Sequence, residues 1–198
     1  MNTIETNLLK YIDNAVSYQQ YLSDIQEIIS AKSAPEDMQE YYQLNLQRMN
    51  RLDKTLILNE NLENRIQNLT NPISFLIISE GWCSDAAQII PVVVKIAEAN
   101  PILDVKIVYR DQNEELMNQY LTNDSKSIPI VIGVDKNTGE EKFVWGPRPA
   151  FCTQILRQYK AGDFTFDEFK VNLQKAYNKD KGNAIIEELL TKLEIDED

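Results

Sequence analysis

Residues 73–88 read Ile-Ser-Phe-Leu-Ile-Ile-Ser-Glu-Gly-Trp-Cys-Ser-Asp-Ala-Ala-Gln, and this stretch decides the fold. Its first seven residues are apolar except for two serines and are rich in β-branched and aromatic types, which predicts a buried central strand. A helical pattern then runs from Ser84 to about Asn100, and a second β-rich run covers residues 105–109. We therefore expect a βαβ unit with Cys83 at the junction between the first strand and its helix.

The residues that follow extend this unit. The sequence predicts a helix from Glu114 to about Leu121, a strand over residues 129–134 and a second strand over residues 141–145. Residues 135–139, Asp-Lys-Asn-Thr-Gly, have the composition of a hairpin turn between these two strands. A further helix is expected from about Pro149 to Lys160, so that two antiparallel strands follow two parallel ones.

The chain on either side of this unit is predicted to be helical. Residues 1–70 contain no glycine, and their apolar residues recur at helical spacing. We expect a first helix that ends near Ser30 with a break in its middle, a second from Pro35 to about Leu58 and a short third over residues 60–69. The predicted organisation is a helical N-terminal extension (residues 1–70), a central domain (71–161) and a C-terminal helical segment with an acidic tail (162–198).

The composition argues against several classes of function. The chain has no histidine, two distant cysteines, and six glycines of which none falls in a phosphate-binding pattern. These facts argue against Ser-His-Asp and Cys-His catalysis, a zinc site and nucleotide binding. The net charge of −11 argues against binding to a phosphate backbone. We therefore expect no metal, no cofactor and no nucleic acid partner.

The sequence also bears on location. No basic region followed by an apolar run is visible at the N-terminus, and no apolar run approaches the roughly 20 residues of a membrane span. We expect a cytoplasmic protein without a membrane partner. In that compartment Cys83 and Cys152 are better interpreted as thiols than as a disulfide.

The motif around Cys83 resembles a known superfamily. Thioredoxins carry Trp-Cys-x-x-Cys at this junction, a proline eight residues after the first cysteine and a cis-proline before the third strand. This sequence has Trp82, Cys83, Pro91 and Pro129 in those places. It resembles a bacterial thioredoxin-like family with a helical N-terminal extension and a single-cysteine Trp-Cys-Ser-Asp-Ala motif. The resemblance implies an α/β thioredoxin fold, with a central mixed sheet of about four to five strands flanked by helices.

Two departures from the thioredoxin pattern affect the chemistry. The resolving cysteine is replaced by Ala86, so a mixed disulfide on Cys83 needs an external thiol for its release. Thioredoxins also bury an aspartate six residues before the nucleophile, where this chain has Ile77. The resemblance therefore implies a one-thiol site without its usual proton acceptor.

Position alone favours a reactive Cys83, because a helix N-terminus presents unpaired N–H groups to the thiolate. Asp85 opposes this effect, since a carboxylate in the first turn disfavours a second negative charge nearby. We take Cys83 and Asp85 as the candidate catalytic residues. The residues leave the direction of the net pKa shift open.

The fold that the resemblance implies also predicts a groove beside Cys83. Arg148 is expected to flank Cys83, where it either stabilises a thiolate or substrate carboxylate or forms a salt bridge, with Asp85 as the nearest obvious partner. Trp82 and Trp145 are expected either to line the groove or to cap the core. As a cis-proline, Pro129 would present the backbone of Ile128 to an extended substrate. Candidate substrate-binding residues are Trp82, Ile128, Pro129 and Arg148.

Cys152 is the other thiol. It lies further along the helix that follows the last strand, and a disulfide needs Cα atoms roughly 4.4 to 6.8 Å apart. We therefore interpret Cys152 as a small buried hydrophobic residue rather than as the resolving thiol.

These observations leave three functional hypotheses. The first is a thiol-disulfide oxidoreductase that acts through Cys83 on protein or small-molecule disulfides, with the mixed disulfide released by an external thiol. The second is a non-catalytic binding module in which Cys83 is a relic. The third is a redox sensor in which Cys83 is oxidised or capped by a small thiol. The oligomeric state does not follow from the sequence.

Overall fold

The computed structural model describes residues 8–195 of the chain, built around one mixed sheet. Four strands lie in the order β2-β1-β3-β4. β1 pairs in parallel with β2 and antiparallel with β3, and β3 pairs antiparallel with β4. The predicted βαβ unit followed by a hairpin is thus confirmed. The strands are β1 (Ile73–Ser79), β2 (Asp104–Tyr109), β3 (Ile130–Asp135) and β4 (Glu141–Trp145).

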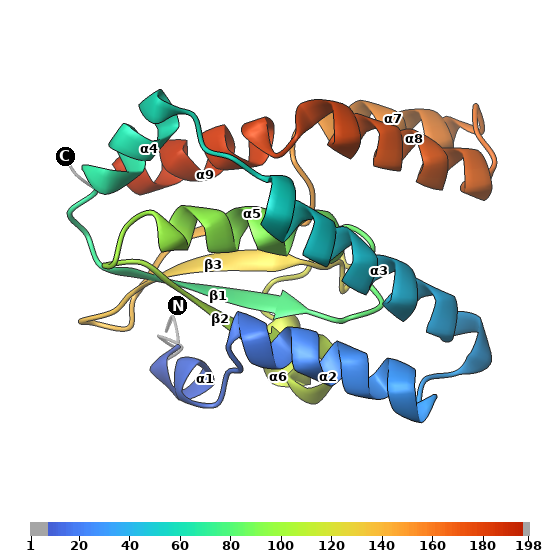
Figure 1. Cartoon of the computed structure of the whole chain (residues 1–198), viewed down its shortest axis with the longest axis horizontal. Coiled ribbons are helices and arrows are strands. Elements are labelled where there is room, and N and C mark those ends of the chain that lie inside the picture. The colour runs from blue at the N-terminus through green and yellow to red at the C-terminus, as the bar shows by residue number, and fades with distance from the viewer. Residues whose placement is uncertain (1–7, 196–198) are drawn as a thin grey trace.

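Helix α5 (Ala86–Glu98) connects β1 to β2 and is the central helix of the structure. Nearly all of its residues are buried, including Pro91, because the sheet covers one side of it and other helices cover the rest. All seven residues of β1 are buried too, as expected for a central strand with helices on both faces. The end of β1 and the start of α5 therefore lie in the interior of the fold, between helices (Figure 1).

The N-terminal extension is helical, as predicted. It forms α1 (Leu9–Asp13), α2 (Tyr18–Ala31), α3 (Glu36–Thr55) and α4 (Glu60–Gln67). The predicted break lies between α1 and α2, where the N–H and C=O groups of Val16 bond to Ile107 of β2 at 2.8 and 2.9 Å. The break thus gives edge strand β2 a partner on its open side.

The segment after β2 contains a short turn of 3₁₀ helix, η1 (Arg110–Gln112), and α6 (Glu114–Met117). Helix α6 is shorter than the predicted helix, which extended to about Leu121. Gln119 and Tyr120 donate to the carbonyls three residues before them instead of four, so the chain tightens into a turn. The helical pattern of the sequence did not reveal this turn.

Three helices follow β4: α7 (Phe151–Ala161), α8 (Phe166–Asp180) and α9 (Asn183–Ile195). Thr165 and Glu168 form a reciprocal capping box at the start of α8. Arg65 of α4 binds Glu187 and Glu194 of α9 at 2.6 and 2.8 Å, which ties the N-terminal extension to the C-terminal segment. The last three residues of the acidic tail lie outside the described residues.

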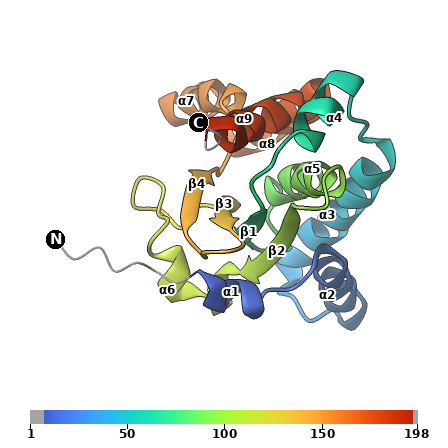
Figure 2. The ribbon, with the colours of Figure 1, turned by 90° about the vertical axis from the view of Figure 1, so that its left-hand side faces the viewer.

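The helices form two layers around the sheet. Helices α4, α5 and α9 lie on one side, and α1, α2 and α6 lie on the other (Figures 1 and 2). Buried residues from all three parts of the chain form one hydrophobic cluster, which includes Tyr21, Phe75, Ile90 and Leu189. Helix α3 and the α7–α8 pair extend past the end of β1 at which Cys83 lies (Figure 1). None of the helices within residues 8–195 is both long enough and apolar enough to cross a membrane.

Candidate functional site

The loop between β1 and α5 carries Cys83. The Cys83 N–H donates to the Glu80 carbonyl at 3.0 Å, and the Cys83 carbonyl accepts from the N–H of Ala87 at 3.1 Å. The thiol is 7% exposed, and its Sγ donates to the Ile128 carbonyl at 3.4 Å. Cys83 therefore lies just before the helix, with its side chain directed at the segment that enters β3.

Burial is the largest influence on the Cys83 thiol. It raises the pKa of Cys83 to about 12, and the negative charge of Asp85 adds to this effect. The backbone N–H groups of Ala86 and Asp85 and the charge of Arg148 lower the pKa, but by less. The N–H groups at the start of the helix thus lower the pKa of Cys83 as expected, but burial and the Asp85 charge raise it by more. In this conformation Cys83 is a neutral thiol at pH 7.

Asp85 is the centre of a buried polar cluster beside the thiol. It is 8% exposed, and its two oxygens accept from Arg148 Nη2 at 2.7 Å and from the Tyr177 hydroxyl at 2.8 Å. Of the two interpretations of Arg148, the salt bridge to Asp85 is the one that the structure shows. Arg148 Nε is buried and has no partner among the described residues.

Cys152 lies in the first turn of α7 and is fully buried. Both cysteines are free thiols. Burial raises the pKa of Cys152 to about 12, while a hydrogen bond with Tyr177 lowers it. Cys152 is therefore packed against the tyrosine that binds Asp85, and it behaves as the buried residue that we expected.

Of the predicted substrate-binding residues, Trp82, Ile128 and Arg148 line one groove together with Cys83, and Pro129 is not among its lining residues. The Arg110 guanidinium lies 4.9 Å from the centre of the Trp82 ring. The peptide bond between Ile128 and Pro129 is cis. Trp145 does not line this groove: it is 6% exposed and its Nε1 donates to Glu188 at 2.8 Å. Of the two interpretations of Trp145, the core position is correct.

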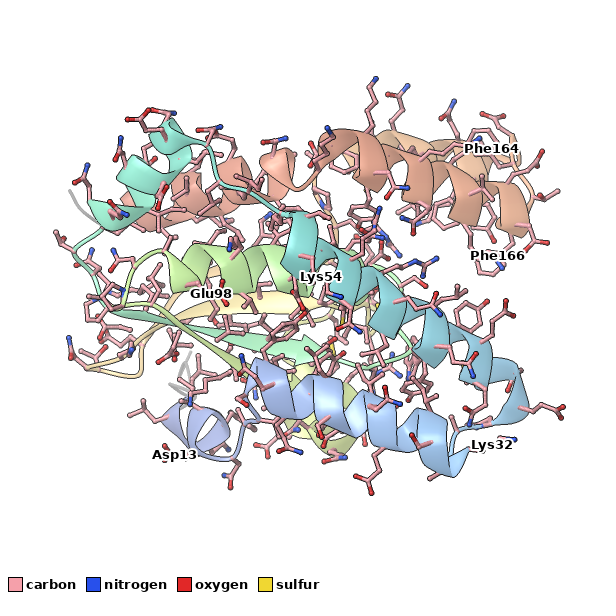
Figure 3. The ribbon with its side chains drawn as sticks, viewed as in Figure 1. Asp13, Lys32, Lys54, Glu98, Phe164 and Phe166 are labelled. Atoms are coloured by element: carbon pink, nitrogen blue, oxygen red, sulfur yellow. The ribbon has the colours of Figure 1, made fainter. Side chains whose placement is uncertain are left out.

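The groove has a volume of about 720 Å³, which suits a small ligand or a peptide segment. One wall is α3, the other is α8, and the Cys83 loop and the residues before β3 lie between them. Figure 3 shows Phe166, at the start of α8, on the side of the α7–α8 pair that faces α3. Besides Trp82, Cys83, Asp85, Ile128 and Arg148, the lining includes Met38, Tyr41, Leu44, Arg48, Ser84, Arg110, Phe166, Phe169 and Tyr177.

Helix α3 also fixes the loop, a role that the sequence analysis missed. Asn45 is fully buried and its Nδ2 donates to the Gly81 carbonyl at 3.0 Å. Arg48 donates to Asn45 Oδ1 at 2.8 Å and to Ser84 Oγ at 3.4 Å. A Cβ at Gly81 would lie 2.7 Å from Ile25 and 2.8 Å from Tyr42, so the extension packs directly on the loop backbone. The sequence does contain one sign of this role: Asn45 is a polar residue spaced three and four positions from the apolar Tyr42 and Met49, where a buried apolar side chain is expected.

Residue 77, six positions before Cys83, is where thioredoxins bury an aspartate and this chain has an isoleucine. Ile77 is fully buried in β1. The buried carboxyl nearest in sequence to Cys83 on its N-terminal side is Glu80, which accepts from the Asp111 N–H at 3.0 Å. Burial raises the pKa of Glu80. Glu80 is thus hydrogen-bonded to η1, the turn that follows β2.

The described residues contain no group of three or more Cys, Asp or Glu side chains that could hold a metal ion.

Comparisons with known proteins place this geometry in context. A family model described as thioredoxin matches residues 31–160. The crystal structure of a protein of unknown function from Pseudomonas aeruginosa matches with a TM-score of 0.67 at 15% identity, over 94% of this chain and 96% of that chain. The crystal structure of an HIV epitope-scaffold matches with a TM-score of 0.64 at 15% identity, over the same shares of the two chains. At this identity both show the fold alone. A search of curated proteins finds no match.

Proposed function

Because the chain belongs to the thioredoxin family, whose model matches residues 31–160, we propose that it is a thiol-disulfide oxidoreductase with Cys83 as its one nucleophile. The observation that carries the proposal is the placement of Cys83. Its Sγ lies in a groove, at the Ile128 carbonyl, with the N–H groups of Asp85 and Ala86 directed at it. A thiolate formed there has backbone donors at hand and lies in the lining of the groove.

The proposed reaction has two exchange steps. The Cys83 thiol gives up its proton, and its sulfur attacks one sulfur of a substrate disulfide. The bond between the two substrate sulfurs breaks, and the leaving thiolate takes up a proton. An external thiolate then attacks the substrate sulfur of the mixed disulfide and returns Cys83 as a thiolate. The two steps release one substrate sulfur as a thiol and leave the other in a disulfide with the external thiol. A second external thiolate attacks the external sulfur of that disulfide and completes the reduction, so two external thiols are oxidised with no net change in Cys83.

Ala86 supports the need for an external thiol. It begins α5 at the place where a dithiol motif has its second cysteine, and Cys152 is fully buried. Neither residue provides an accessible thiol within the groove. The proposal assigns the protein to the cytoplasm, because thiols are kept reduced in that compartment and can serve as the external partner.

The test is alkylation of the native protein with iodoacetamide between pH 6 and pH 10, together with trapping of mixed disulfides. We expect slow modification at pH 7 that accelerates with pH and is lost in Cys83→Ser but kept in Cys152→Ser. Incubation with a disulfide should add one mixed disulfide, at Cys83, and a small thiol should remove it. Absence of both reactions in the folded protein would contradict the proposal.

A second candidate is the non-catalytic binding module, and one observation favours it. Cys83 is 7% exposed and burial raises its pKa to about 12, which are properties of an inert thiol. The same experiments separate the candidates. Protein partners trapped on Cys83 favour the oxidoreductase, adducts of small thiols alone favour a sensor, and an unreactive Cys83 favours the binding module.

A further inference from the structure

The groove beside Cys83 carries positive charge in a strongly acidic chain. The net charge of the whole chain is −11, yet the groove lining contains six cationic side chains and two carboxylates. The carboxylates are Glu40 and Asp85. The cations are Arg48, Arg110, Lys126, Arg148, Lys170 and Lys175.

Arg48 is the cation closest to the Cys83 loop that has no carboxylate partner. Arg110, Lys126, Arg148 and Lys170 form ion pairs with Asp111, Glu114, Asp85 and Asp167. Within residues 8–195 no carboxylate oxygen lies within 4.0 Å of Arg48. Its guanidinium instead donates to the neutral oxygens of Asn45 and Ser84.

The surroundings of Arg48 leave its charge uncompensated. The side chain is partly buried, and burial together with the neighbouring charge of Arg51 lowers its pKa. A guanidinium in such a place binds a carboxylate well, because its flat array of donors matches the two oxygens. Ser84, which Arg48 contacts, follows Cys83 directly. A carboxylate on Arg48 would therefore lie next to the reacting sulfur.

The rest of the groove is apolar and long. Three large hydrophobic side chains on its walls are exposed: Leu44 at 37%, Phe166 at 54% and Val171 at 50%. On α3 the lining runs from Arg48 back to Met38. The ten helical steps from Met38 to Arg48 span about 15 Å at 1.5 Å per step. An extended peptide covers that distance with about five residues, at roughly 3.3 Å each.

We propose that this groove binds a peptide segment of a partner protein, in which an acidic residue next to the reactive cysteine binds Arg48 and apolar residues contact the walls of α3 and α8. The inference rests on the proposed function and names its substrate class. The unpaired charge of Arg48 selects an acidic residue beside the cysteine, and the length of the apolar walls selects a peptide rather than a small thiol.

The first experiment measures exchange rates. Five-residue peptides with a central cysteine are activated as mixed disulfides with thionitrobenzoate, and release of the coloured thiolate is followed after mixing with the protein. In this step the Cys83–peptide disulfide forms, the peptide–thionitrobenzoate disulfide breaks, and the electron pair leaves with thionitrobenzoate. We expect a peptide with glutamates beside the cysteine and terminal leucines to react about tenfold faster than its lysine counterpart.

Variants of Arg48 give the decisive comparison. Arg48→Gln should remove most of the preference by slowing the glutamate peptide more than the lysine peptide, and Arg48→Lys should restore part of it. Arg157→Gln, the same change at an exposed position of α7 outside the groove, should alter neither rate. Equal rates for the two peptides in the wild type, or equal slowing of both by Arg48→Gln, would overturn the inference. So would an Arg48-dependent preference confined to a small acidic thiol, activated mercaptosuccinate.

A second measurement is independent of the chemistry of Cys83. The same peptides with serine in place of cysteine and a fluorescent label are titrated with the protein, and binding is read from anisotropy. Tighter binding of the glutamate peptide, weakened by salt and by Arg48→Gln, supports the groove even if Cys83 proves unreactive. If Cys83 exchanges with disulfides but neither peptide is preferred, the proposed function stands and this inference fails.

Discussion

Nη2 of Arg148 lies 2.7 Å from Oδ2 of Asp85, so the cation expected beside Cys83 is already paired with the carboxylate of the same motif. This ion pair explains why Arg148 does little to activate the thiol. The Asp85 charge raises the pKa of Cys83 by more than Arg148 lowers it, and burial raises it further. The reactivity of Cys83 therefore depends on the removal of the Asp85 charge or on the exposure of the thiol.

Removal of the Asp85 charge should make Cys83 more reactive. In Asp85→Asn the second-largest cause of the raised pKa is absent, so we expect the rate of iodoacetamide modification at pH 8 to rise severalfold. The variant should also lose about 2 kcal/mol of stability, because Arg148 loses its carboxylate in a partly buried site. Alkylation rates and urea unfolding measure the two effects.

Asp163→Asn is the matched control for this prediction. Asp163 is exposed in the turn between α7 and α8, so its neutralisation should change neither quantity. An unchanged rate in Asp85→Asn would show that the Asp85 charge does not act on the thiol.

Cys83 should make the stability of the fold depend on alkaline pH. Its pKa is about 12 in the folded chain and roughly 8.5 in an unfolded chain. The unfolded state therefore releases its proton first, and stability that is present below pH 8.5 is lost as the pH rises towards 12. Between pH 8 and pH 10 the wild type should lose about 2 kcal/mol more than Cys83→Ala.

Urea unfolding at the two pH values checks this difference. Cys152→Ala shows whether the second buried thiol contributes in the same direction, as its raised pKa requires. Equal losses in the wild type and in Cys83→Ala would mean that the thiol is not buried in solution.

Asn45 should anchor the Cys83 loop. It is fully buried and its Nδ2 donates to the Gly81 carbonyl at 3.0 Å, so Asn45→Ala removes that donor and one of the two acceptors of Arg48. We expect a loss of about 2 kcal/mol in stability and faster alkylation of Cys83, because the loop is freed on its α3 side.

Asn50→Ala provides the comparison, since Asn50 is exposed on the same helix. Both variants are examined by thermal unfolding and by alkylation at pH 8. If Asn45→Ala unfolds more easily but Cys83 reacts as in the wild type, Asn45 stabilises the fold without positioning the loop.

A cysteine at position 86 should convert the site to a dithiol. Ala86 is fully buried at the first residue of α5, and residues three apart around a helix start lie close enough for their side chains to meet. Ala86→Cys should release the mixed disulfide internally. We expect it to reduce insulin with dithiothreitol measurably faster than the wild type, which should show weak activity.

Ala87→Cys controls for the addition of a thiol, because Ala87 is equally buried but follows one position later. Its activity should remain at the level of the wild type. Robust insulin reduction by the wild type would show that a resolving thiol already exists in this chain.

Local patterns were sufficient for much of the architecture. The apolar run before Cys83 predicted β1, the Asp-Lys-Asn-Thr-Gly turn predicted the β3–β4 hairpin, and the glycine-free segment predicted the helical extension. These features depend on residues close in sequence. The end of α6 was predicted wrongly, because the turn that ends it accompanies the packing of Leu116 and Met117 in the core, and a local pattern does not show that packing.

The candidate site shows the same division. The position of Cys83 at the end of a central strand, the absence of a second cysteine in its motif and the Arg148–Asp85 pair could all be anticipated from the sequence. The partners of Asn45 and Arg48 could not, because these residues lie 36 positions from Gly81 and Ser84, which they bind. No local pattern encodes that distance.

The sequence by itself thus determined the strand, the helix and the single thiol between them, because periodicity and residue type are local properties. Only the tertiary structure decided the character of that thiol. Burial of the thiol against the segment before β3 raises its pKa, Asp85 forms an ion pair with Arg148, and α3 brings Arg48 to the groove. Burial and ion pairing depend on contacts between segments that are distant in the sequence, and these contacts form only when the whole chain is packed.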